Sequence, residues 1–457
     1  MVNTTEPTEA RLTDADNLLV APAAARDDAP GDLVGDLVRD FFGAAATPEE
    51  LASGALDLTG KTVYLCGDLS GIDEQRLRAA DRVFVVRESS RGHRGDGGGT
   101  GDGADGANGG IHDNGGDGGD RDGGDGGDGR DPGDRVGGGD ASWTSVDLGR
   151  VPIRVHDVGV YYRRFFDPDA DHFGRITAEH EFQTLTESTK PGTAHRTGIY
   201  LTPVTRDGDD LHFRLLRCST NLAGPTEGFR PTDTGIVEAL DREAAVVFRD
   251  HAPLNHVLAQ IYHNTAAAPG RKQAKAKISA HADKTKDMPA NGIMAFCTFY
   301  DGLDKLRPMP GDPFDRGVKG ASGLTRLRFR LKDPADERDG VPARFSLTLY
   351  PGSVFFMPLS TNRLYTHEIR PSALDAELLP LRLGYVVRCS NAEAVHKNGA
   401  TYLKKNGGLV KLHPPTQEGM DELRRLYAEE NKSSSFIDYG DDIPFSMNKG
   451  DYVAPRP

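Results

Sequence analysis

The sequence predicts an α+β protein whose core is a double-stranded β-helix (a jelly roll, cupin-like) with helices packed against it. Two segments with apolar residues at helical spacing, 236–250 and 255–264, precede a run of strand-like segments. At least five such strands follow, about 15–30 residues apart and separated by turn residues. Helices followed by many short strands are typical of a sandwich or jelly roll that is covered by helices on one side.

The first 140 residues are predicted to form three different segments. Residues 1–30 are rich in Ala, Asp, Thr and Pro, and we expect them to be disordered. Residues 31–90 are expected to form an α/β segment, because helical periodicity is followed by the strand-like runs TVYLCGD and RVFVVRE. Residues 91–140 repeat Gly and Asp with almost no apolar residue, so they lack the core of a calcium-binding β-roll. They are predicted to be a flexible, self-repelling insert.

Residues 141–400 hold the predicted core domain, and residues 401–457 a C-terminal helix and tail. The core domain is expected to begin with strands within 151–166, 197–204 and 211–218. After the two helical segments, the later strands are IMAFCTFYD, LTRLRFRLK, ARFSLTLYPGSVFFMPL, LYTHEIRP and LRLGYVVRCS. The C-terminal helix is expected over Gln417–Glu430.

The net charge of −14 is unevenly distributed along the chain. Residues 1–140 hold 29 acidic and 13 basic residues, and the remainder holds 40 acidic and 42 basic residues. A polyanionic partner therefore stays compatible with the core domain. The segment from Arg271 to Lys286 contains six basic residues and one acidic residue. Such a cluster is typical either of a solvent-exposed face or of a surface that binds the phosphates of a nucleic acid. No apolar run approaches the roughly 18 residues of a membrane span, so we expect no membrane association.

The motif with the clearest chemical meaning is the His-x-Asp pair His281 and Asp283, within KISAHADKTKDMPANGIMAFCTFYDG. In an extended segment, residues i and i+2 point to the same side, so both side chains can face one metal ion. Two imidazoles and a carboxylate on one face of the metal are the ligand set of non-haem Fe(II) oxygenases. The pair alone is a weak signal, because two polar residues that cap a turn have the same spacing.

The chain also offers a third ligand and a cation near it. His367, just after the apolar strand PGSVFFMPL, is predicted to complete the metal site. If the open metal positions bind a 2-oxo acid, its distal carboxylate needs a buried cation, for which the forked guanidinium of Arg suits best. Arg382 lies 15 residues beyond His367 in the strand RLGYVVR. Arg388 lies six residues after Arg382 in the same strand. Because this separation is even, we expect both side chains to point to the same face and Arg388 to contribute to the cofactor site.

Six stretches between roughly residues 150 and 395 extend this pattern: EHEFQTLTESTKPGTAHRTGIYLTPV, CSTNLAGPTEGF, LNHVLAQIYHN, HADKTKDMPANGIMAFCTFY, LYTHEIRP and LPLRLGYVVRCSN. Together they resemble the TET/JBP dioxygenases, which oxidise 5-methylpyrimidines in nucleic acid. The likeness is to the compact protist, algal and fungal members. The resemblance implies that His281, Asp283 and His367 hold iron and carry the catalysis. It implies further that Arg382 binds the 2-oxoglutarate carboxylate.

The resemblance implies oxidation of the 5-methyl group of 5-methylcytosine in double-stranded DNA, with Fe(II), 2-oxoglutarate and O2. The products would be 5-hydroxymethylcytosine and further oxidised bases. Enzymes of this kind flip the target base out of the duplex. An algal branch uses ascorbate as the cosubstrate and places a glyceryl group on the 5-methyl group. In that case Arg382 would lose its role.

The resemblance also suggests contacts to cosubstrate and substrate. Tyr262 and Asn264 occupy the place where related oxygenases contact the cosubstrate, although polar groups at a helix end would look the same. The remaining candidates concern DNA: Thr220 and Asn221 could reach a flipped base, Arg196 could hold phosphate or base, and Lys284 and Lys286 could line the approach of the duplex. Each has a structural alternative. Thr220 and Asn221 could belong to a turn, Arg196 could form an exposed salt bridge, and Lys284 and Lys286 could be ordinary surface lysines.

Two other functions stay open from the sequence. AlkB-like removal of N-methyl groups would use the same ligands and the same Arg. A nucleic-acid-binding module without catalysis would keep DNA binding after the ligands are lost. We expect a monomer, and a location in the nucleus that rests on the DNA substrate alone, since no targeting signal is found.

Overall fold

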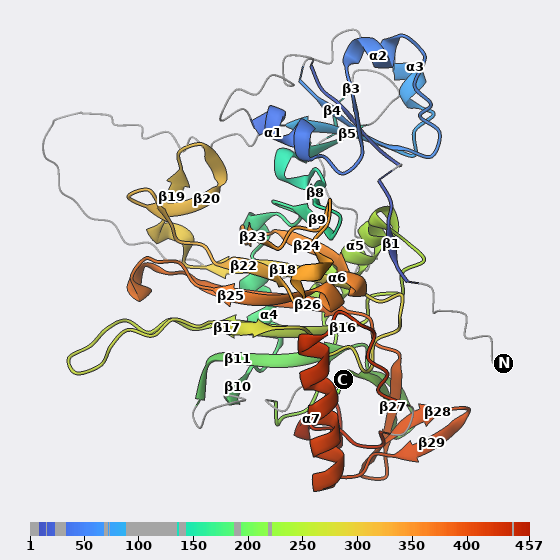
Figure 1. Ribbon diagram of the computed structural model, residues 1–457, viewed down its shortest axis with the longest axis vertical. Helices are drawn as coiled ribbons and strands as arrows, with labels where there is room; N and C mark the ends of the chain where they lie inside the picture. The colour runs from blue at the N-terminus through green and yellow to red at the C-terminus, as the bar shows by residue number, and fades with distance from the viewer. Residues whose placement is uncertain are drawn as a thin grey trace, which may run out of the picture.

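The computed structural model describes most of the chain. The described residues are 9–14, 16–22, 33–67, 72, 74–87, 135–136, 143–186, 193–217, 222–440 and 443–457. They form an α+β structure with an N-terminal sheet at one end and a group of antiparallel sheets in the middle (Figure 1). Within these ranges, no helix is both long enough and apolar enough to cross a membrane. Nearly all of the predicted insert at 91–140, and Thr220 and Asn221, fall outside them.

Eight strands of the middle region build the predicted double-stranded β-helix. Their bounds are β16 (His256–Tyr262), β17 (Ile278–His281), β18 (Ile293–Asp301), β22 (Arg326–Leu331), β23 (Arg344–Thr348), β24 (Val354–Pro358), β25 (Tyr365–Arg370) and β26 (Leu381–Arg388). Four strands pair in a major sheet in the order β16-β26-β18-β24, and four in a minor sheet in the order β17-β25-β22-β23. The chain thus crosses repeatedly from one sheet to the other, as in a jelly roll.

The major sheet continues at both edges and carries helices on its outer face. The added strands are β8 (Ile153–Val155), β9 (Gly159–Tyr162), β10 (Gln183–Thr186), β11 (Thr193–Thr202) and β14 (Glu227–Gly228). The covering helices are α4 (His172–Glu179) and α5 (Pro231–Val247). In β18, Ala295 and Cys297 pack in the cluster that includes both helices, whereas Met294 and Phe296 pack between the two sheets. The predicted helices on one side of the barrel are confirmed for residues 236–247.

The second predicted helical segment, residues 255–264, is wrong, because it forms strand β16. Apolar residues lie at both parities of this strand, and both of its faces are covered, so the period of two is hidden. Val257, Ala259 and Ile261 pack toward the helices, and Tyr262 packs between the sheets. Tyr262, at the end of β16, and Asn264, two residues beyond it, line one small cavity.

The N-terminal sheet is larger than the predicted segment 31–90. Its strand order is β3-β2-β4-β5-β7-β6, and all neighbours except β6 run parallel. The strands are β2 (Asn17–Val20), β3 (Ala44–Ala46), β4 (Thr62–Cys66), β5 (Arg82–Arg87), β6 (Arg135–Val136) and β7 (Trp143–Asp147), joined in part by α1 (Leu33–Asp40), α2 (Pro48–Ala52) and α3 (Glu74–Leu77). The expectation of disorder over 1–30 is wrong for β2, whose four residues are all buried. The boundary at 140 is also displaced, because β7 belongs to this sheet.

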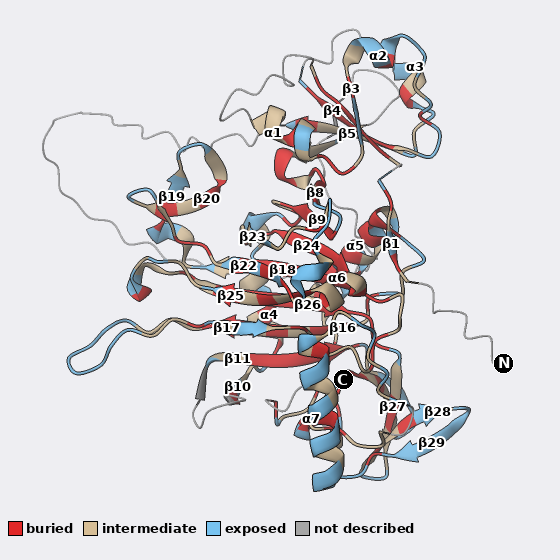
Figure 2. Ribbon diagram, in the orientation of Figure 1, coloured by how far each residue is buried: buried red, intermediate tan, exposed pale blue. Residues whose placement is uncertain are grey.

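The remaining elements flank the barrel. They are β1 (Arg11–Leu12), β12 (Thr205–Asp207), β13 (Asp210–Leu215), β15 (Phe248–Arg249), β19 (Arg307–Met309), β20 (Asp312–Val318), β21 (Ala321–Ser322), β27 (Ala392–Lys397), β28 (Ala400–Lys405), β29 (Gly408–Lys411), α6 (Leu359–Leu364) and α7 (Gln417–Lys432). The predicted boundary at 400 falls inside the hairpin of β27 and β28, which pair directly. Helix α7 is confirmed, and it is mostly exposed beside the buried barrel strands (Figure 2).

Candidate metal and cosubstrate site

The structure brings the three predicted metal ligands together on the inner side of the minor sheet. His281, at the end of β17, is paired with His367 of β25, and Asp283 follows two residues after His281. One ligand atom from each lies within 4.8 Å of the others. Asp283 Oδ1 is 3.5 Å from His281 Nε2 and 3.8 Å from His367 Nε2. The side chain of His281 is 34% exposed, whereas those of Asp283 and His367 are 12% and 4% exposed. The site therefore opens on the His281 side.

Each histidine has one feature that suits a metal ligand: a fixed tautomer in His281 and a lowered pKa in His367. His281 Nδ1 lies 2.9 Å from the carbonyl oxygen of Ser279, which can only accept, so Nδ1 carries the proton. Such a bond fixes the tautomer and ring orientation of a metal-binding histidine. Burial, together with the nearby His281, lowers the pKa of His367 to about 3. The ring of His367 is therefore neutral at ordinary pH, as a metal ligand requires.

Asp283 is held by Arg388, which differs from the role predicted for this arginine. Arg388 donates from Nε and Nη2 to Asp283 Oδ2, at 3.0 and 2.5 Å, while Oδ1 faces the two histidines. Burial would raise the pKa of Asp283, but the charge of Arg388 and the two neighbouring histidines hold it well below its ordinary value. The prediction that Arg388 shares the face of Arg382 is right. Its guanidinium, however, binds the carboxylate of Asp283, a candidate metal ligand.

Arg382 lies in a separate small cavity, in which Tyr262, Asn264, Tyr300 and Thr325 are also lining residues. Its Cζ atom stands 3.8 Å from the centre of the Tyr262 ring, and the residue is 4% exposed. In the described part of the chain, its Nε has no hydrogen-bond partner. A buried guanidinium with an unused donor and no carboxylate beside it fits an anionic ligand. The structure thus brings Arg382, Tyr262 and Asn264 together, as predicted.

Sequence reasoning missed the residue that holds the backbone of the His-x-Asp segment. Asn362, which is buried in α6, accepts a hydrogen bond from the Asp283 N–H and donates one to the Asp283 carbonyl, both at 2.9 Å. This paired contact fixes the direction in which the Asp283 side chain leaves the backbone. Only the position of α6 just before β25 could have suggested a link to the site.

Helix α7 supports the same segment from the outside. Asn431 accepts from the Ala282 N–H at 2.7 Å, and Glu430 accepts from the N–H and hydroxyl of Thr285 at 3.1 and 2.5 Å. Lys284 donates to the carbonyl of Tyr427 at 3.0 Å. Lys284 is therefore bound to α7, and its place along the approach of DNA stays a prediction.

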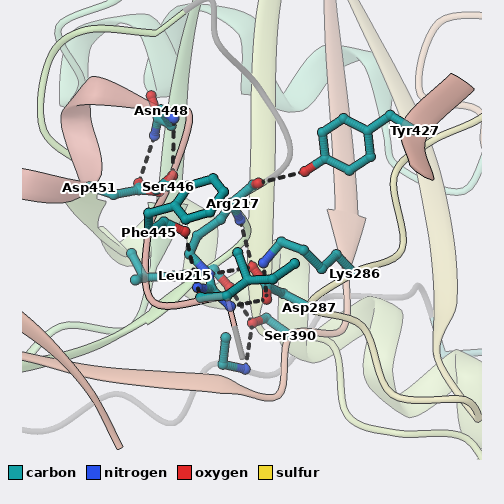
Figure 3. Close-up of polar contacts among 12 residues, drawn as sticks. Leu215, Arg217, Lys286, Asp287, Ser390, Tyr427, Phe445, Ser446, Asn448 and Asp451 are labelled. Atoms are coloured by element: carbon teal, nitrogen blue, oxygen red, sulfur yellow. Dashed lines mark hydrogen bonds and ion pairs between the residues drawn. The ribbon is translucent and has the colours of Figure 1, made fainter. Parts of the chain in front are cut away.

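Lys286 is also committed to an internal contact (Figure 3), and its side chain is only 4% exposed. Its Nζ lies 2.9 Å from Asp287 Oδ1, and Arg217 binds both oxygens of the same carboxylate. Arg217 also donates to the carbonyls of Ile443 and Phe445, so the ion cluster fastens the C-terminal tail beside the site. The prediction that Lys286 lines the approach of DNA is wrong, because its charge is buried and paired.

Removing the α7 contact should weaken metal binding. We expect Asn431→Ala to lower the affinity for Fe(II) by about 10–100-fold, because supporting residues of metal sites have effects of that size. Calorimetric titration with Co(II), which does not oxidise in air as Fe(II) does, provides the measurement. The control is Arg424→Ala, an exposed residue of the same helix whose ion pair is with Asp421. Equal affinities in the two variants would show that α7 does not hold the metal segment.

The other predicted substrate residues have mixed outcomes. Arg196 stands directly opposite Tyr262 in the pairing of β11 with β16, so both side chains lie on the same face of the major sheet. It is partly exposed and close to the Arg382 cavity. Thr220 and Asn221 lie outside the described residues. In the basic stretch from Arg271 to Lys286, Lys275 donates to the carbonyls of Ser372 and Leu374 and is likewise committed internally.

A second group of possible ligands, Glu179, His180 and Asp233, is not suited to a metal. His180 is fully buried, and its two ring nitrogens already bond Glu227 and Asp233 at 2.9 and 2.6 Å. Burial would lower the pKa of His180, but Asp233 and Glu227 raise it to about 9. The ring is therefore an imidazolium that links α5 to β14 and leaves no lone pair for a metal.

This imidazolium should make stability depend on pH. Its contribution is complete below the unfolded-state pKa of about 6.5 and is lost as pH rises through 9, a change of up to roughly 3 kcal/mol. Urea unfolding at pH 6, 7.5 and 9.5 should therefore show a falling free energy of unfolding. His180→Gln should be less stable at pH 6 and should lose most of the fall between pH 6.5 and 9. An identical pH dependence in both proteins would contradict the assignment.

Comparisons with known proteins give a fold likeness of limited extent. No model of a known protein family matches the sequence, and no curated protein matches it. Similar solved structures include the non-heme alpha ketoglutarate dependent epimerase SnoN from nogalamycin biosynthesis, at 15% identity and a TM-score of 0.28 over 53% of this chain and 83% of that one. OsALKBH1 has 11% identity and a TM-score of 0.31, over 52% and 99% of the two chains. A prolyl-4-hydroxylase from Pseudomonas putida has 14% identity and a TM-score of 0.26, over 50% and 92%. At such TM-scores the likeness adds nothing to the strand order described above.

Proposed function

We propose that this protein is a non-haem Fe(II)- and 2-oxoglutarate-dependent dioxygenase. The observation that carries the proposal is the pairing of two features inside one barrel. His281, Asp283 and His367 offer two imidazoles and a carboxylate within 4.8 Å, which is a facial donor set. Arg382 offers a buried, unused donor in a cavity of the facing sheet, as the distal carboxylate of 2-oxoglutarate requires. The two features come from opposite sheets, and the Arg388–Asp283 ion pair connects those sheets.

Each residue has a distinct part in this proposal. His281, Asp283 and His367 would hold Fe(II), which with 2-oxoglutarate and O2 supplies the oxidising power for a C–H bond. Arg388 keeps Asp283 ionised and turned toward the histidines. Arg382 and Tyr262 would orient the cosubstrate in the cavity that they line together. The overall reaction converts 2-oxoglutarate and O2 to succinate and CO2 and places one oxygen atom on the substrate.

The proposed substrate is 5-methylcytosine in double-stranded DNA, and the proposed product is 5-hydroxymethylcytosine, which can be oxidised further. This choice rests on the resemblance to the TET/JBP dioxygenases around His281 and Asp283. Arg196, which is partly exposed beside the Arg382 cavity, remains available for a phosphate or a base. A DNA substrate would place the protein in the nucleus.

A panel of methylated duplexes tests the choice of substrate. The protein is incubated with Fe(II), 2-oxoglutarate and duplexes of one sequence that carry 5-methylcytosine, N6-methyladenine or 3-methylcytosine. We expect succinate release and base oxidation only with 5-methylcytosine. Formaldehyde release from an N-methylated duplex would indicate AlkB-like demethylation. Binding of the duplexes without any turnover, unchanged in His281→Ala, would indicate a binding module.

A further inference from the structure

The outer face of the minor sheet carries an arginine grid. Its members are Arg326, Arg328 and Arg330 of β22, Arg344 of β23 and Arg370 of β25, all of them exposed. The residues between them in β22, Leu327 and Phe329, point inward and pack in the core between the sheets. This alternation follows from the period of two in a strand, so the β22 arginines form a row on one surface.

The grid has almost no acidic counterpart. Glu368 pairs with Arg370 at 2.8 Å, and in the described residues no carboxylate lies within ion-pair distance of the other four arginines. Some exposed arginines elsewhere are paired, as Arg425 is with Glu422 and Glu429 on α7. Others in the described residues, such as Arg206 and Arg307, have no ion pair either, but they do not share one sheet face with several further arginines. Glu368 also lies opposite Arg328 in the strand register, and Asp315 interacts electrostatically with Arg326. Even so, five arginines gather on one sheet face, and only Arg370 among them has an ion pair in the described residues.

Strand register brings like charges opposite each other within the grid. Arg330 is paired with Arg344 of β23, and Arg326 is paired with Arg370 of β25. Like charges directly opposite each other destabilise a sheet. A bound polyanion would remove that repulsion, which gives the arrangement a physical reason.

The grid surrounds a hollow of about 520 Å³ that suits phosphate groups. Arg328, Arg330, Arg344 and Arg370 line it, and Thr366 adds a hydroxyl donor. The planar fork of Arg matches phosphate oxygens in pairs. Alternate residues of a strand stand about 6.7 Å apart, so a row of arginines can contact several phosphates of one chain.

We propose that the arginine grid is a second nucleic-acid contact that binds the phosphate backbone independently of the metal site. Thr366 and Glu368 flank His367 on β25 and point to the opposite face, so the grid lies on the back of the wall that holds the third ligand. The grid would anchor DNA without regard to its sequence. The bound segment would be either the duplex that carries the target base or a neighbouring part of the same DNA molecule. The choice of nucleic acid over other polyanions rests on the proposed function.

The test is binding of an unmethylated 24-base-pair duplex, measured by fluorescence anisotropy without iron or cosubstrate at several salt concentrations. The variant is Arg328→Gln/Arg330→Gln, and the matched control is Arg242→Gln/Arg249→Gln, which removes two exposed arginines of α5 and β15. We expect the variant to bind at least about tenfold more weakly and its log–log salt slope to fall by about 2, since each lost phosphate contact removes about 0.9. The lysine variant Arg328→Lys/Arg330→Lys should keep most of the affinity, because it keeps the charge.

Three outcomes would overturn the proposal. The first is a Kd and salt slope in Arg328→Gln/Arg330→Gln that equal those of the control. The second is an equal loss in both double variants, which would mean a diffuse charge effect. The third is binding of the wild type to phosphatidylserine vesicles but not to the duplex, which would assign the grid to a membrane surface. Because no turnover is measured, these outcomes are independent of 5-methylcytosine oxidation, whose failure would leave the binding result intact.

Discussion

His281→Ala is expected to abolish iron binding and to reduce oxidation of 5-methylcytosine by far more than 100-fold. Loss of a residue that merely supports a metal ligand costs about 10–100-fold, so loss of a ligand should cost more. The ring of His281 is one-third exposed, and its Nδ1 bonds only a backbone carbonyl, so its removal should leave the fold intact. The measurements are iron content by mass spectrometry and base oxidation by nucleoside analysis.

The matched control for this prediction is His413→Ala, which removes an exposed histidine outside the site. The control should retain both iron and activity. Full iron content in His281→Ala, with both proteins equally stable to heat, would mean that the three residues are not the metal site.

Arg382→Gln is expected to raise the KM for 2-oxoglutarate while the iron content stays unchanged. Removal of one partner of a buried charge pair costs about 2–5 kcal/mol, which corresponds to between roughly thirtyfold and several-thousandfold. The guanidinium is 4% exposed and its Nε has no partner in the described residues, so the cosubstrate carboxylate would be its natural acceptor. Steady-state kinetics with varied 2-oxoglutarate measures the effect.

Arg388→Gln distinguishes the two arginines of β26. Since Arg388 binds Asp283 and Arg382 does not, Arg388→Gln should lower the affinity for iron, whereas Arg382→Gln should not. If Arg382→Gln left the KM for 2-oxoglutarate unchanged and activity depended on ascorbate, the site would belong to an enzyme that uses ascorbate as its cosubstrate.

Much of the barrel interior follows from strand parity. The spacing of His281 and Asp283, and of Arg382 and Arg388, correctly predicts that each pair points inward, because residues of equal parity share a face. The same argument does not determine the partner of Arg388. That partner depends on how far the segment after β17 folds toward β26, which is a long-range property.

The mistakes also have physical causes. Residues 255–264 look helical because β16 is apolar on both faces, and this removes the alternation that identifies a strand. Lys286 of the basic stretch looks like part of a surface for DNA, but charge counts do not show that Asp287 engages it. Similarly, β2 is only four residues long within a polar region, and its burial depends on pairing with β3 and β4.

The most direct test of the central claim is mass spectrometry of nucleosides from 5-methylcytosine DNA after incubation with Fe(II) and O2. Parallel reactions contain 2-oxoglutarate, ascorbate or neither. If the protein uses Fe(II) and binds 2-oxoglutarate through Arg382, the reaction with 2-oxoglutarate should yield 5-hydroxymethylcytosine and an equal amount of succinate. Unchanged 5-methylcytosine in all three reactions would contradict the claim.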